Sequence, residues 1–428
     1  MIVLSDRINV REVILEMLMD VNRNNTFSHI LLKNVLDKYN YLEEQDKAFI
    51  KRVFEGTLER EITIDHVINT YSKVPAEKMK PLIRSLIRMS VYQILYMDRV
   101  PDSAAINEAV KLAKKRKFSS LSGFVNGVLR TVSREKENCL KSDELSVRYS
   151  ANELLVESLR EDYGDEKAAD ILEHSLKERH LTVRIREELY KSDIDEILDE
   201  WEKEGIEFRC LLEPSYAYEL KNTGDLERLD CFKRGLYTVM DASSMLVCEN
   251  AHIKEGDIVL DVCAAPGGKC LHAVSKGAQV EARDVSEYKV SLIEENIKRL
   301  NAKNITVKVW DATDPDESIK DHADVVIADV PCSGFGVISK KPDIKNNITK
   351  DGLDSIVELQ RKIIDNVCHY VKPGGVLMYS TCTLRKAENE DQVAYIVKNH
   401  PFEQEFVKTV FPDEDHDGFF IARLKRIG

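Results

Sequence analysis

The first 140 residues carry apolar side chains at helical spacing. One stripe has the i, i+3, i+4, i+7 pattern of a single helix face: Val10, Val13, Ile14, Met17, Leu18 and Val21. Similar stripes run over residues 49–58 and 82–95, and Pro81 stands just inside the start of the latter, where its missing N–H costs nothing. Residues 1–140 are therefore predicted to form an all-α bundle, and none of these stripes carries a pattern typical of catalysis.

The hydrophobic pattern becomes mixed between residues 141 and 235. Residues 134–150 are polar and charged, which is typical of a linker. After them come four stretches of alternating type: one or two helices over 152–176, a strand over 181–185, an acidic helix over 194–201 and an extended stretch over 206–212. We expect a linker followed by a small α+β subdomain.

From residue 236 to the end, strand-like and helical patterns alternate at the spacing of βα units. Short apolar runs predict strands over 258–262, 279–284, 304–310, 324–328 and 375–378. Such alternation is typical of an open, largely parallel sheet with helices on its faces. The chain is therefore predicted to be multi-domain, with domains over 1–140, 141–235 and 236–428.

Composition narrows the class of protein. Hydrophobic residues are 43% of the 428 residues and charged residues 32%, as in a soluble globular protein, and the longest apolar runs are only strand-length. The charged Asp6 and Arg7 come too early for a secretory signal. Because the apolar runs are short, we expect no membrane span. The nine cysteines are odd in number and contain no C-x-x-C pair, so we also expect no metal site and a reducing, cytoplasmic location.

The net charge of −13 is unevenly distributed. Residues 1–150 carry about +5, residues 151–250 about −13 and residues 251–428 about −5. The densest basic run is Lys111–Lys117, followed by Phe118. Such a run is either a solvated helix face or a phosphate-binding patch, and charge alone leaves both open.

A predicted strand over 258–262 runs into a loop of small residues with two glycines, which lets a ligand approach the backbone closely. The loop lacks both the G-x-G-x-x-G of nicotinamide-binding folds and the G-x-x-x-x-G-K-[ST] of P-loops. S-adenosyl-L-methionine fits better. The residues predicted to line its site from this loop are Cys263, Ala264, Ala265, Pro266, Gly267, Gly268 and Lys269.

Acids end the next predicted strands. Asp284 comes sixteen residues past Gly268, close to the spacing at which dinucleotide folds place a ribose-binding acid. Asp311 ends the third strand, where it is placed to bind the adenine amino group, and Asp329 ends the fourth. A single such acid is more often a helix cap than a ligand, but three in successive strands form a pattern that favours a cofactor site.

Two cysteines follow predicted strands fifty residues apart. Cys332 comes after Asp329-Val330-Pro331, and Cys382 comes after Tyr379-Ser380-Thr381. Because ligands bind at the carboxyl ends of parallel strands, both sulfurs are expected at one crevice. A thiolate there can act as a nucleophile, and a second thiol can help to reverse the bond. The alternative is a pair of small core residues, since free cysteine is commonly buried.

These segments together resemble the RNA cytosine-C5 methyltransferases of the Nol1/Nop2/Sun family. Cys263–Lys269 is similar to motif I of that family, Asp329–Gly334 to motif IV and Ser380–Thr383 to the nucleophile motif VI. The N-terminal bundle resembles the NusB-type RNA-binding fold, in the segments 105–113 and 124–130. The resemblance implies an all-α NusB-like bundle, a small RNA-recognition-like α+β subdomain and a Rossmann-like class I methyltransferase domain.

The resemblance also implies roles for individual residues. Cys382 would attack carbon 6 of cytosine, because thiolate addition there makes carbon 5 enamine-like. Asp329 would bind the N3 and amino edge of the base and supply or stabilise a proton. Pro331 would hold the loop rigid, and Cys332 would assist release of the nucleophile. Lys269 would lie near the base or the cofactor carboxylate.

The implied substrate is a specific cytosine in small-subunit (16S) ribosomal RNA, methylated by a monomer that uses S-adenosyl-L-methionine. Three alternatives stay open. The target is another RNA, such as transfer RNA or large-subunit ribosomal RNA; or the chain methylates protein or a small molecule, which gives no reason for the paired cysteines; or it is a non-catalytic NusB-like RNA-binding factor, which leaves Cys382 and Asp284 unexplained.

Overall fold

The computed structural model describes residues 8–24, 28–177, 180–186, 194–341, 344–345 and 348–428. Within these residues the chain forms two compact units. The N-terminal unit comprises the chain up to residue 160, together with residues 168–176 and 341–348. The C-terminal unit comprises residues 161–167, 177–340 and 349–428.

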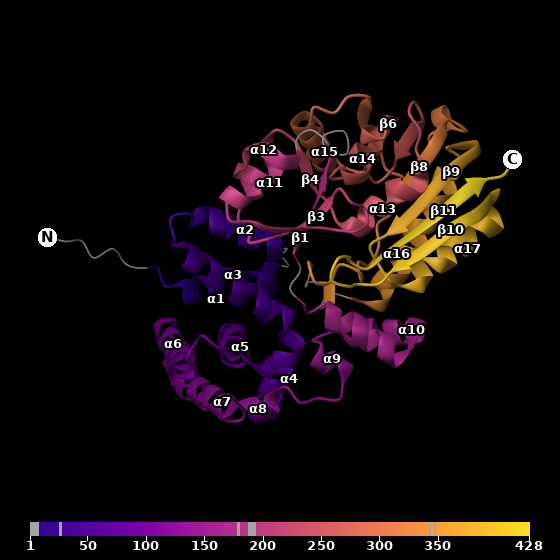
Figure 1. The fold of residues 1–428 in the computed structure, drawn as a ribbon. Helices are drawn as coiled ribbons and strands as arrows, with labels where there is room; N and C mark the ends of the chain where they lie inside the picture. Colours follow the sequence, from indigo (N-terminus) through magenta and orange to yellow (C-terminus); the bar gives the residue numbers. More distant parts are fainter. Residues whose placement is uncertain (1–7, 25–27, 178–179, 187–193, 342–343, 346–347) are drawn as a thin grey trace. The chain divides into compact units, whose positions relative to one another are not determined.

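The N-terminal unit is a bundle of α-helices, as the apolar stripes predict (Figure 1). Its main helices are α1 (Val10–Asn24), α2 (Ser28–Lys38), α3 (Glu44–Glu59), α4 (Glu61–Tyr71), α5 (Pro81–Tyr96), α6 (Asp102–Lys115) and α7 (Ser122–Arg134). Helix α5 is buried along almost its whole length and contacts α1, α3, α4, α6 and α7. Pro81 occupies its first turn, as predicted.

The polar stretch 134–150 is folded and not the simple linker that its composition predicts. It contains two short helices, α8 (Lys136–Cys139) and α9 (Leu145–Arg148). The Thr63 hydroxyl of α4 donates a hydrogen bond to the Val147 carbonyl at 2.5 Å, and Ser150 Oγ accepts one from the Ile62 amide at 3.1 Å. The partners of this stretch lie more than 80 residues away in sequence, which is why composition did not reveal its structure. Helix α10 (Glu153–His174) follows and is interrupted at Gly164, where φ is 78°.

A small antiparallel sheet stands at the start of the C-terminal unit, with the order β2-β3-β1-β4. Its strands are β1 (Leu181–Ile185), β2 (Glu207–Cys210), β3 (Ala217–Lys221) and β4 (Tyr237–Val239). Helix α11 (Ile194–Lys203) covers one face through Trp201, which is fully buried against Phe208, Tyr218 and Tyr237. The small α+β subdomain is therefore present, and its fourth strand lies beyond residue 236.

The other face of the small sheet is also covered. Arg184 of β1 is 1% exposed, and its guanidinium donates a hydrogen bond to Ser275 Oγ of helix α14 (Gly268–Ser275) at 3.1 Å. Helix α13 (Ala242–Ala251) contacts β1 as well. The subdomain thus packs against α13 and α14 of the same unit.

The large sheet has seven strands in the order β10-β11-β9-β8-β5-β6-β7. They are β5 (Ile258–Asp261), β6 (Gln279–Asp284), β7 (Ile305–Val309), β8 (Ala323–Asp329), β9 (Val371–Thr381), β10 (Phe402–Val410) and β11 (Phe419–Arg426). Strands β5 to β9 pair in parallel, whereas β10 and β11 pair antiparallel at one edge. This is the open, largely parallel sheet that the βα spacing predicts.

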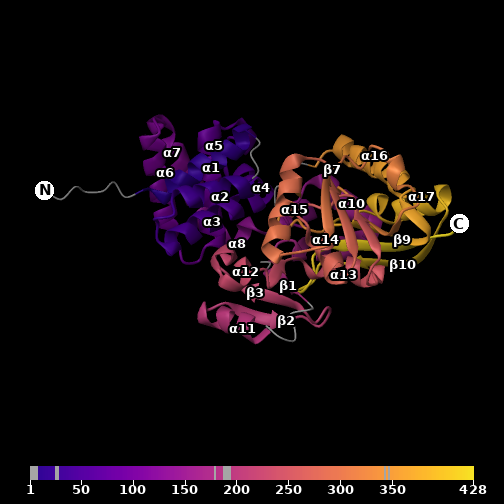
Figure 2. The same ribbon diagram turned by 90° about the horizontal axis from the view of Figure 1, so that it is seen from above.

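Helices cover both faces of this sheet. On one side lie α13, α14 and α15 (Glu287–Leu300), and on the other α16 (Lys350–Val367) and α17 (Glu390–Asn399), as Figure 2 shows. Successive strand residues serve opposite cores, since Val325 and Ile327 pack on the α13–α15 side and Val326 and Ala328 on the α16–α17 side. A strand buried on both faces must be apolar throughout, which explains the continuous apolar runs in the sequence.

The strand order reverses between β5 and β8. From β5 the chain proceeds outward through β6 and β7, and then returns to the other side of β5 as β8. The crevice at the carboxyl ends of strands at such a switch point is where open α/β sheets bind ligands. Asp261 ends β5 and Asp329 ends β8, so both acids lie at this crevice. No helix among the described residues is long and apolar enough to cross a membrane.

Replacing Trp201 by alanine tests the packing of the small sheet. Trp201 is fully buried among three aromatic rings, so we expect Trp201→Ala to lower the free energy of unfolding by about 3–5 kcal/mol. Leu212→Ala is the control, because Leu212 is 93% exposed and its loss should change stability by less than about 0.5 kcal/mol. Urea denaturation monitored by far-UV circular dichroism measures the free energy of unfolding of both variants. Equal losses of stability would contradict the packing of Trp201 against the three rings.

Candidate active site

The loop after β5 is fastened to the end of β6. The Ala264 amide donates a hydrogen bond to the Arg283 carbonyl and the Ala265 amide to Asp284 Oδ2, each at 2.9 Å. Gly267 stands at the start of α14 with φ of 110°, a conformation that residues with a side chain rarely adopt. The loop therefore presents backbone at the crevice. Cys263, predicted to line it, is partly buried, and burial raises the pKa of its thiol, as do Asp261 and Asp284.

Asp284 is only 3% exposed and is held on both oxygens. Oδ2 accepts from Ala265, and Oδ1 accepts from the Val285 amide at 2.8 Å and from Lys289 Nζ at 3.0 Å. A carboxylate has about four lone-pair sites, so three are used and one is left for a ligand hydroxyl. Val285 follows directly and is 51% exposed, which leaves an apolar surface beside the acid.

Asp311 lies at the end of β7 and closes its own turn. Its Oδ1 accepts hydrogen bonds from the amide of Thr313 at 2.8 Å and from the Thr313 hydroxyl at 2.7 Å. These hydrogen bonds, the amide first, lower the pKa of Asp311. The capping role that the sequence left open is thus present, while the exposed side chain still faces solvent at the crevice edge.

Asp261 was not among the predicted site residues, yet it is the most unusual acid of the crevice. It is 1% exposed, and neither carboxylate oxygen makes a hydrogen bond of normal geometry with the described residues. Burial above all, and then the charges of Asp329 and Asp284, raise its pKa to about 7 against the opposing effect of Lys269. A buried carboxyl of this kind favours a positively charged ligand group, and S-adenosyl-L-methionine carries both an ammonium and a sulfonium. The residues present therefore fit that cofactor.

Lys269 and Asp329 form a partly buried ion pair at the crevice. Lys269 Nζ lies 2.6 Å from Asp329 Oδ2, and the Ser380 hydroxyl donates a hydrogen bond to Asp329 Oδ1 at 2.7 Å. Burial acts to lower the pKa of Lys269, but the negative charges of Asp329, Asp261 and Cys382 raise it above its ordinary value. The ammonium therefore stays charged in the neutral pH range.

The two predicted cysteines meet. The Sγ atoms of Cys332 and Cys382 are 3.1 Å apart, and both side chains are partly exposed. The hydrogen bond to Cys382, followed by burial and by the charges of Cys382, Glu388 and Asp329, raises the pKa of the Cys332 thiol well above its ordinary value. Cys332 therefore keeps its proton and can donate it in a hydrogen bond to a Cys382 thiolate, while the Lys269 ammonium lies within electrostatic range of the same sulfur.

Backbone contacts hold the two cysteine loops together. The Gly336 amide donates a hydrogen bond to the Cys382 carbonyl at 3.0 Å, and the Gly418 amide donates to the Gly336 carbonyl at 2.9 Å. A Cβ atom at Gly336 would stand 1.8 Å from the Gly418 carbonyl oxygen, so only glycine permits this approach. The loops after β8 and β9 and the start of β11 thus form one junction.

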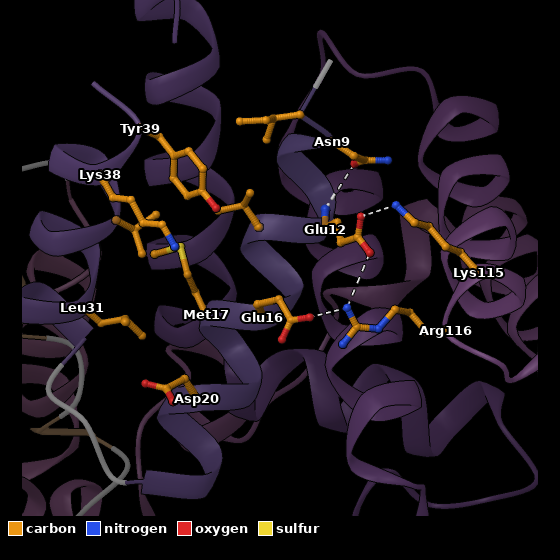
Figure 3. Close-up of a pocket in the computed structure, with 13 residues that line it drawn as sticks. Asn9, Glu12, Glu16, Met17, Asp20, Leu31, Lys38, Tyr39, Lys115 and Arg116 are labelled. Carbon is orange, nitrogen blue, oxygen red and sulfur yellow. Dashed lines mark hydrogen bonds and ion pairs between the residues drawn. The ribbon is translucent and has the colours of Figure 1, made fainter. Parts of the chain in front are cut away.

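A second cavity, of about 680 Å³, lies in the N-terminal unit between α1, α2 and the end of α6 (Figure 3). On one wall Lys115 and Arg116 bind the carboxylates of Glu12 and Glu16. Outside the cavity, Lys111 binds Glu108. The basic run 111–117 is thus largely neutralised, and only its Lys114 and Lys117 form no ion pair with the residues that the structure describes. No group of three or more potential metal ligands occurs in the described part of the chain.

The fold and the crevice together define a methyltransferase of the Rossmann-like type. The family model described as "16S rRNA methyltransferase RsmB/F" matches residues 250–425, and the NusB family model matches residues 8–134. "Probable ribosomal RNA small subunit methyltransferase B" of Bacillus subtilis is 34% identical over 98% of this chain and 99% of its own length. "Ribosomal RNA small subunit methyltransferase B" of Escherichia coli is 31% identical over 90% of this chain and 91% of its own.

Two solved structures share the fold. "Crystal Structure of PH0851" superposes with a TM-score of 0.82 at 24% identity and covers 98% of this chain and 99% of its own. NSun6 from Pyrococcus horikoshii superposes with a TM-score of 0.59 at 22% identity and covers 65% of this chain and 98% of its own. The chain belongs to the RsmB/F family of methyltransferases, with a NusB domain at its N-terminus, and its cofactor is S-adenosyl-L-methionine. The predicted family, fold class and cofactor are thereby confirmed.

The structure brings Lys269, Asp329, Cys332 and Cys382 together and sets Asp284 against the loop 263–267. Sequence reasoning missed Asp261, although an acid as the last residue of the strand before the loop was a visible signal. It also missed Ser380 and the buried pair Glu388 and Asn389, whose importance depends on contacts formed only in the folded chain.

Asp284 provides a test of the cofactor site. We expect Asp284→Ala to weaken S-adenosyl-L-methionine binding by about 1.5–3 kcal/mol, the range for hydrogen bonds to a charged group. Isothermal titration calorimetry measures the affinity, and Asp354→Ala, an exposed acid of α16, is the matched control. Unchanged affinity in Asp284→Ala would remove this acid from the site.

Proposed function

We propose that this protein methylates carbon 5 of a specific cytosine in small-subunit (16S) ribosomal RNA through a covalent bond between Cys382 and carbon 6 of the base. The observation that carries the proposal is the 3.1 Å contact between the Cys332 and Cys382 sulfurs beside the Lys269–Asp329 pair. A methyltransferase acting on an already nucleophilic nitrogen or oxygen has no use for two thiols at its reacting centre.

The chemical difficulty is that carbon 5 of cytosine is a weak nucleophile. Addition of a thiolate to carbon 6 breaks the ring conjugation and makes carbon 5 enamine-like. Cys382 provides this thiolate. A hydrogen bond from the Cys332 thiol and the charge of the Lys269 ammonium both stabilise this thiolate.

Asp329 binds the N3 and amino edge of the cytosine. Its two oxygens are held by Lys269 and by the Ser380 hydroxyl, which fix the plane of the carboxylate against the base. Negative charge develops on the ring during attack, and the adjacent Lys269 ammonium and a proton on the N3 side stabilise it. Pro331 holds the intervening backbone, since the Gln360 side chain donates to its carbonyl at 2.9 Å.

Release reverses the first step. S-adenosyl-L-methionine supplies the methyl group that carbon 5 acquires. Solvent water then takes the carbon 5 proton, the electron pair of that C–H bond forms the carbon 5–carbon 6 double bond, and the Cys382–carbon 6 bond breaks with its electron pair going to the Cys382 sulfur. Cys332 assists this step by offering its proton to the departing sulfur.

The cofactor is held by the loop 263–269 together with Asp284, Asp311 and Asp329, and we add Asp261 to this set. Asp284 accepts from a ribose hydroxyl, Asp311 binds the adenine amino group and Asp261 binds the cationic end of the molecule. The loop backbone after β5 permits close approach.

The ribosomal RNA is bound by the NusB-like bundle, residues 1–140, while residues 141–235 form the connecting subdomain and residues 236–428 perform the chemistry. The substrate assignment is supported by the names of the relatives from Bacillus subtilis and Escherichia coli. Lys114 and Lys117 are the exposed cations of the basic run that are available for phosphates. The protein acts in the cytoplasm as a monomer on an extruded or loop cytosine, since a base must leave the stack to reach the crevice.

The target position can be tested directly. Unmodified 16S ribosomal RNA, transfer RNA and large-subunit ribosomal RNA are each incubated with the protein and S-adenosyl-L-methionine and then sequenced after bisulfite treatment. We expect one protected cytosine, in the 16S RNA alone. Protection only in another RNA would change the substrate, and methyl incorporation without bisulfite protection would contradict C5 chemistry.

The alanine variants of the two cysteines should have opposite defects, one in forming the covalent complex and the other in releasing it. Cys382→Ala removes the nucleophile, so neither methylation nor a covalent protein–RNA complex should form. Cys332→Ala leaves attack and methyl transfer possible but slows release, so the protein should accumulate on its RNA. A denaturing gel with labelled RNA would show a protease-sensitive shifted band for Cys332→Ala only, and a band for Cys382→Ala would reverse the two assignments.

A further inference from the structure

A buried polar pair stands directly behind the two cysteines. Glu388 ends the short 3-10 turn Lys386–Glu388, and Asn389 follows it at the start of α17. Both side chains are 0% exposed. Neither belongs to the crevice described above. Burying a carboxylate costs free energy unless hydrogen bonds or opposite charges compensate for its lost hydration.

Glu388 holds the loop that carries Cys332. Its Oε2 accepts a hydrogen bond from the Ser333 amide at 2.8 Å and another from Gln360 Nε2 at 3.2 Å. The same Gln360 nitrogen donates to the Pro331 carbonyl at 2.9 Å. The residues on both sides of Cys332 are therefore connected to one carboxylate, directly or through Gln360.

Asn389 holds the strand end that carries Cys382. Its Oδ1 accepts from the Thr381 hydroxyl at 2.6 Å, and its Nδ2 donates to the Thr383 carbonyl at 3.0 Å. Thr381 and Thr383 flank Cys382 and are both 0% exposed. One side chain thus contacts the residues on both sides of the nucleophile, the hydroxyl of Thr381 and the backbone carbonyl of Thr383.

We propose that Glu388 and Asn389 are positioning residues that together set the spacing of the Cys332 and Cys382 sulfurs. Adjacent in sequence, they join the two cysteine loops through one short segment of backbone. The proposal rests on the proposed function only for the meaning of that spacing in catalysis; the spacing itself is a property of the free protein.

A direct contact between the loops supports this arrangement. The Ser333 and Thr383 hydroxyls are hydrogen-bonded at 2.7 Å, and the Phe335 amide donates to Thr383 Oγ1 at 3.3 Å. These groups would still form contacts without Glu388 and Asn389, but each is attached to a loop that the pair orients. A shift of the nucleophile by about 1 Å costs on the order of 100-fold in rate, so small losses of order here are measurable.

Glu388 also acts through its charge. Its carboxylate is one of the negative groups, with Cys382 and Asp329, that raise the pKa of the Cys332 thiol. The Arg385 guanidinium lies 3.5 Å from Glu388 Oε1 and offsets part of this charge. Glu388→Gln preserves the shape and the acceptor for the Ser333 amide but removes the carboxylate charge and its pairing with Arg385, so it tests the charge of Glu388 while the bond to the Cys332 loop is kept. A residue that only filled space would leave the reactivity of Cys332 unchanged after this substitution.

The first experiment needs no RNA. The full-length protein is treated with iodoacetamide over a range of pH, and alkylation of each cysteine is followed by peptide mass spectrometry. In Glu388→Gln we expect Cys332 to react several-fold faster near neutral pH than in the unaltered protein, with S-adenosyl-L-methionine affinity unchanged. Glu403→Gln, the same change at an exposed position of β10, is the control.

The second experiment measures methyl transfer. In Asn389→Ala we expect kcat to fall roughly 10- to 100-fold with an unchanged KM for S-adenosyl-L-methionine. Thr381→Val removes the hydroxyl that donates to Asn389 Oδ1 and leaves the bond from Asn389 Nδ2 to Thr383, so its kcat should lie between those of Asn389→Ala and the unaltered protein. Asn399→Ala is the control, because Asn399 lies on the same helix and bonds only within it.

The outcomes separate the two proposals. Unchanged alkylation of both cysteines in Asn389→Ala together with unchanged kcat in Thr381→Val overturns the positioning role, even if the protein methylates cytosine. Altered alkylation of Cys332 or Cys382 in Asn389→Ala, in a protein that methylates no cytosine, supports the positioning role and removes the proposed function. If Asn389→Ala unfolds, Thr381→Val, which removes one of the two bonds of Asn389 at nearly constant side-chain volume, must still lower kcat or the role is refuted.

Discussion

The parallel pairing of β8 with β9 is the constraint on which the active site depends. The two strands lie side by side with Asp329 opposite Ser380. Because the chain leaves both strands at the same edge, the residues just beyond that pair must meet above it, and these include Cys332 and Cys382. A slip of one residue in this register would turn every side chain to the other face and separate the sulfurs. The alternating packing of Val325, Val326 and Ile327 into two different cores prevents that slip.

The charged groups of the active site also come from the carboxyl ends of the parallel strands. Three strand-end acids, Asp261, Asp284 and Asp329, converge on a crevice where the ammonium groups of Lys269 and Lys289 pair with two of them. The site thus has an excess of negative charge, which suits a cationic methyl donor, and the unfavourable burial appears in the raised pKa of Asp261, about 7. A cation bound beside Asp261 would favour its ionised form, so cofactor binding and ionisation of this acid support each other.

Much of this architecture could be predicted from sequence, because strands buried on both faces and amphipathic helices leave local patterns. The loop 263–269 and the acids ending their strands follow from the rule that parallel sheets bind ligands at their carboxyl edge. The features that the sequence left open or predicted wrongly depend on partners that are distant along the chain. From sequence, the basic run 111–117 could be a solvated helix face or a phosphate-binding patch. Only the fold brings Lys115 to Glu12, 103 residues away in sequence. The stretch 134–150 was expected to be a linker, whereas its partners lie on α4.

The junction behind the cysteines shows the same limit. Glu388 and Asn389 look like surface residues of a helix start, and nothing in their local pattern indicates burial. Their contacts with Ser333 and Thr381 exist only because the loops after β8 and β9 converge. Sequence patterns thus identify groups that act on ligands more readily than groups that orient them, since the latter are defined by partners rather than by position along a strand.

The central claim is that Cys382, and no other residue, bonds to the base. Small-subunit ribosomal RNA containing 5-fluorocytidine tests it most directly, because carbon 5 then carries a fluorine that cannot leave as a proton does, and the covalent complex persists. The complex is digested with protease and nuclease, and the modified peptide is sequenced by mass spectrometry. The account predicts a single nucleotide-bearing peptide with the modification on Cys382. Modification of Cys332, or recovery of methylated RNA without any covalent complex, would contradict it.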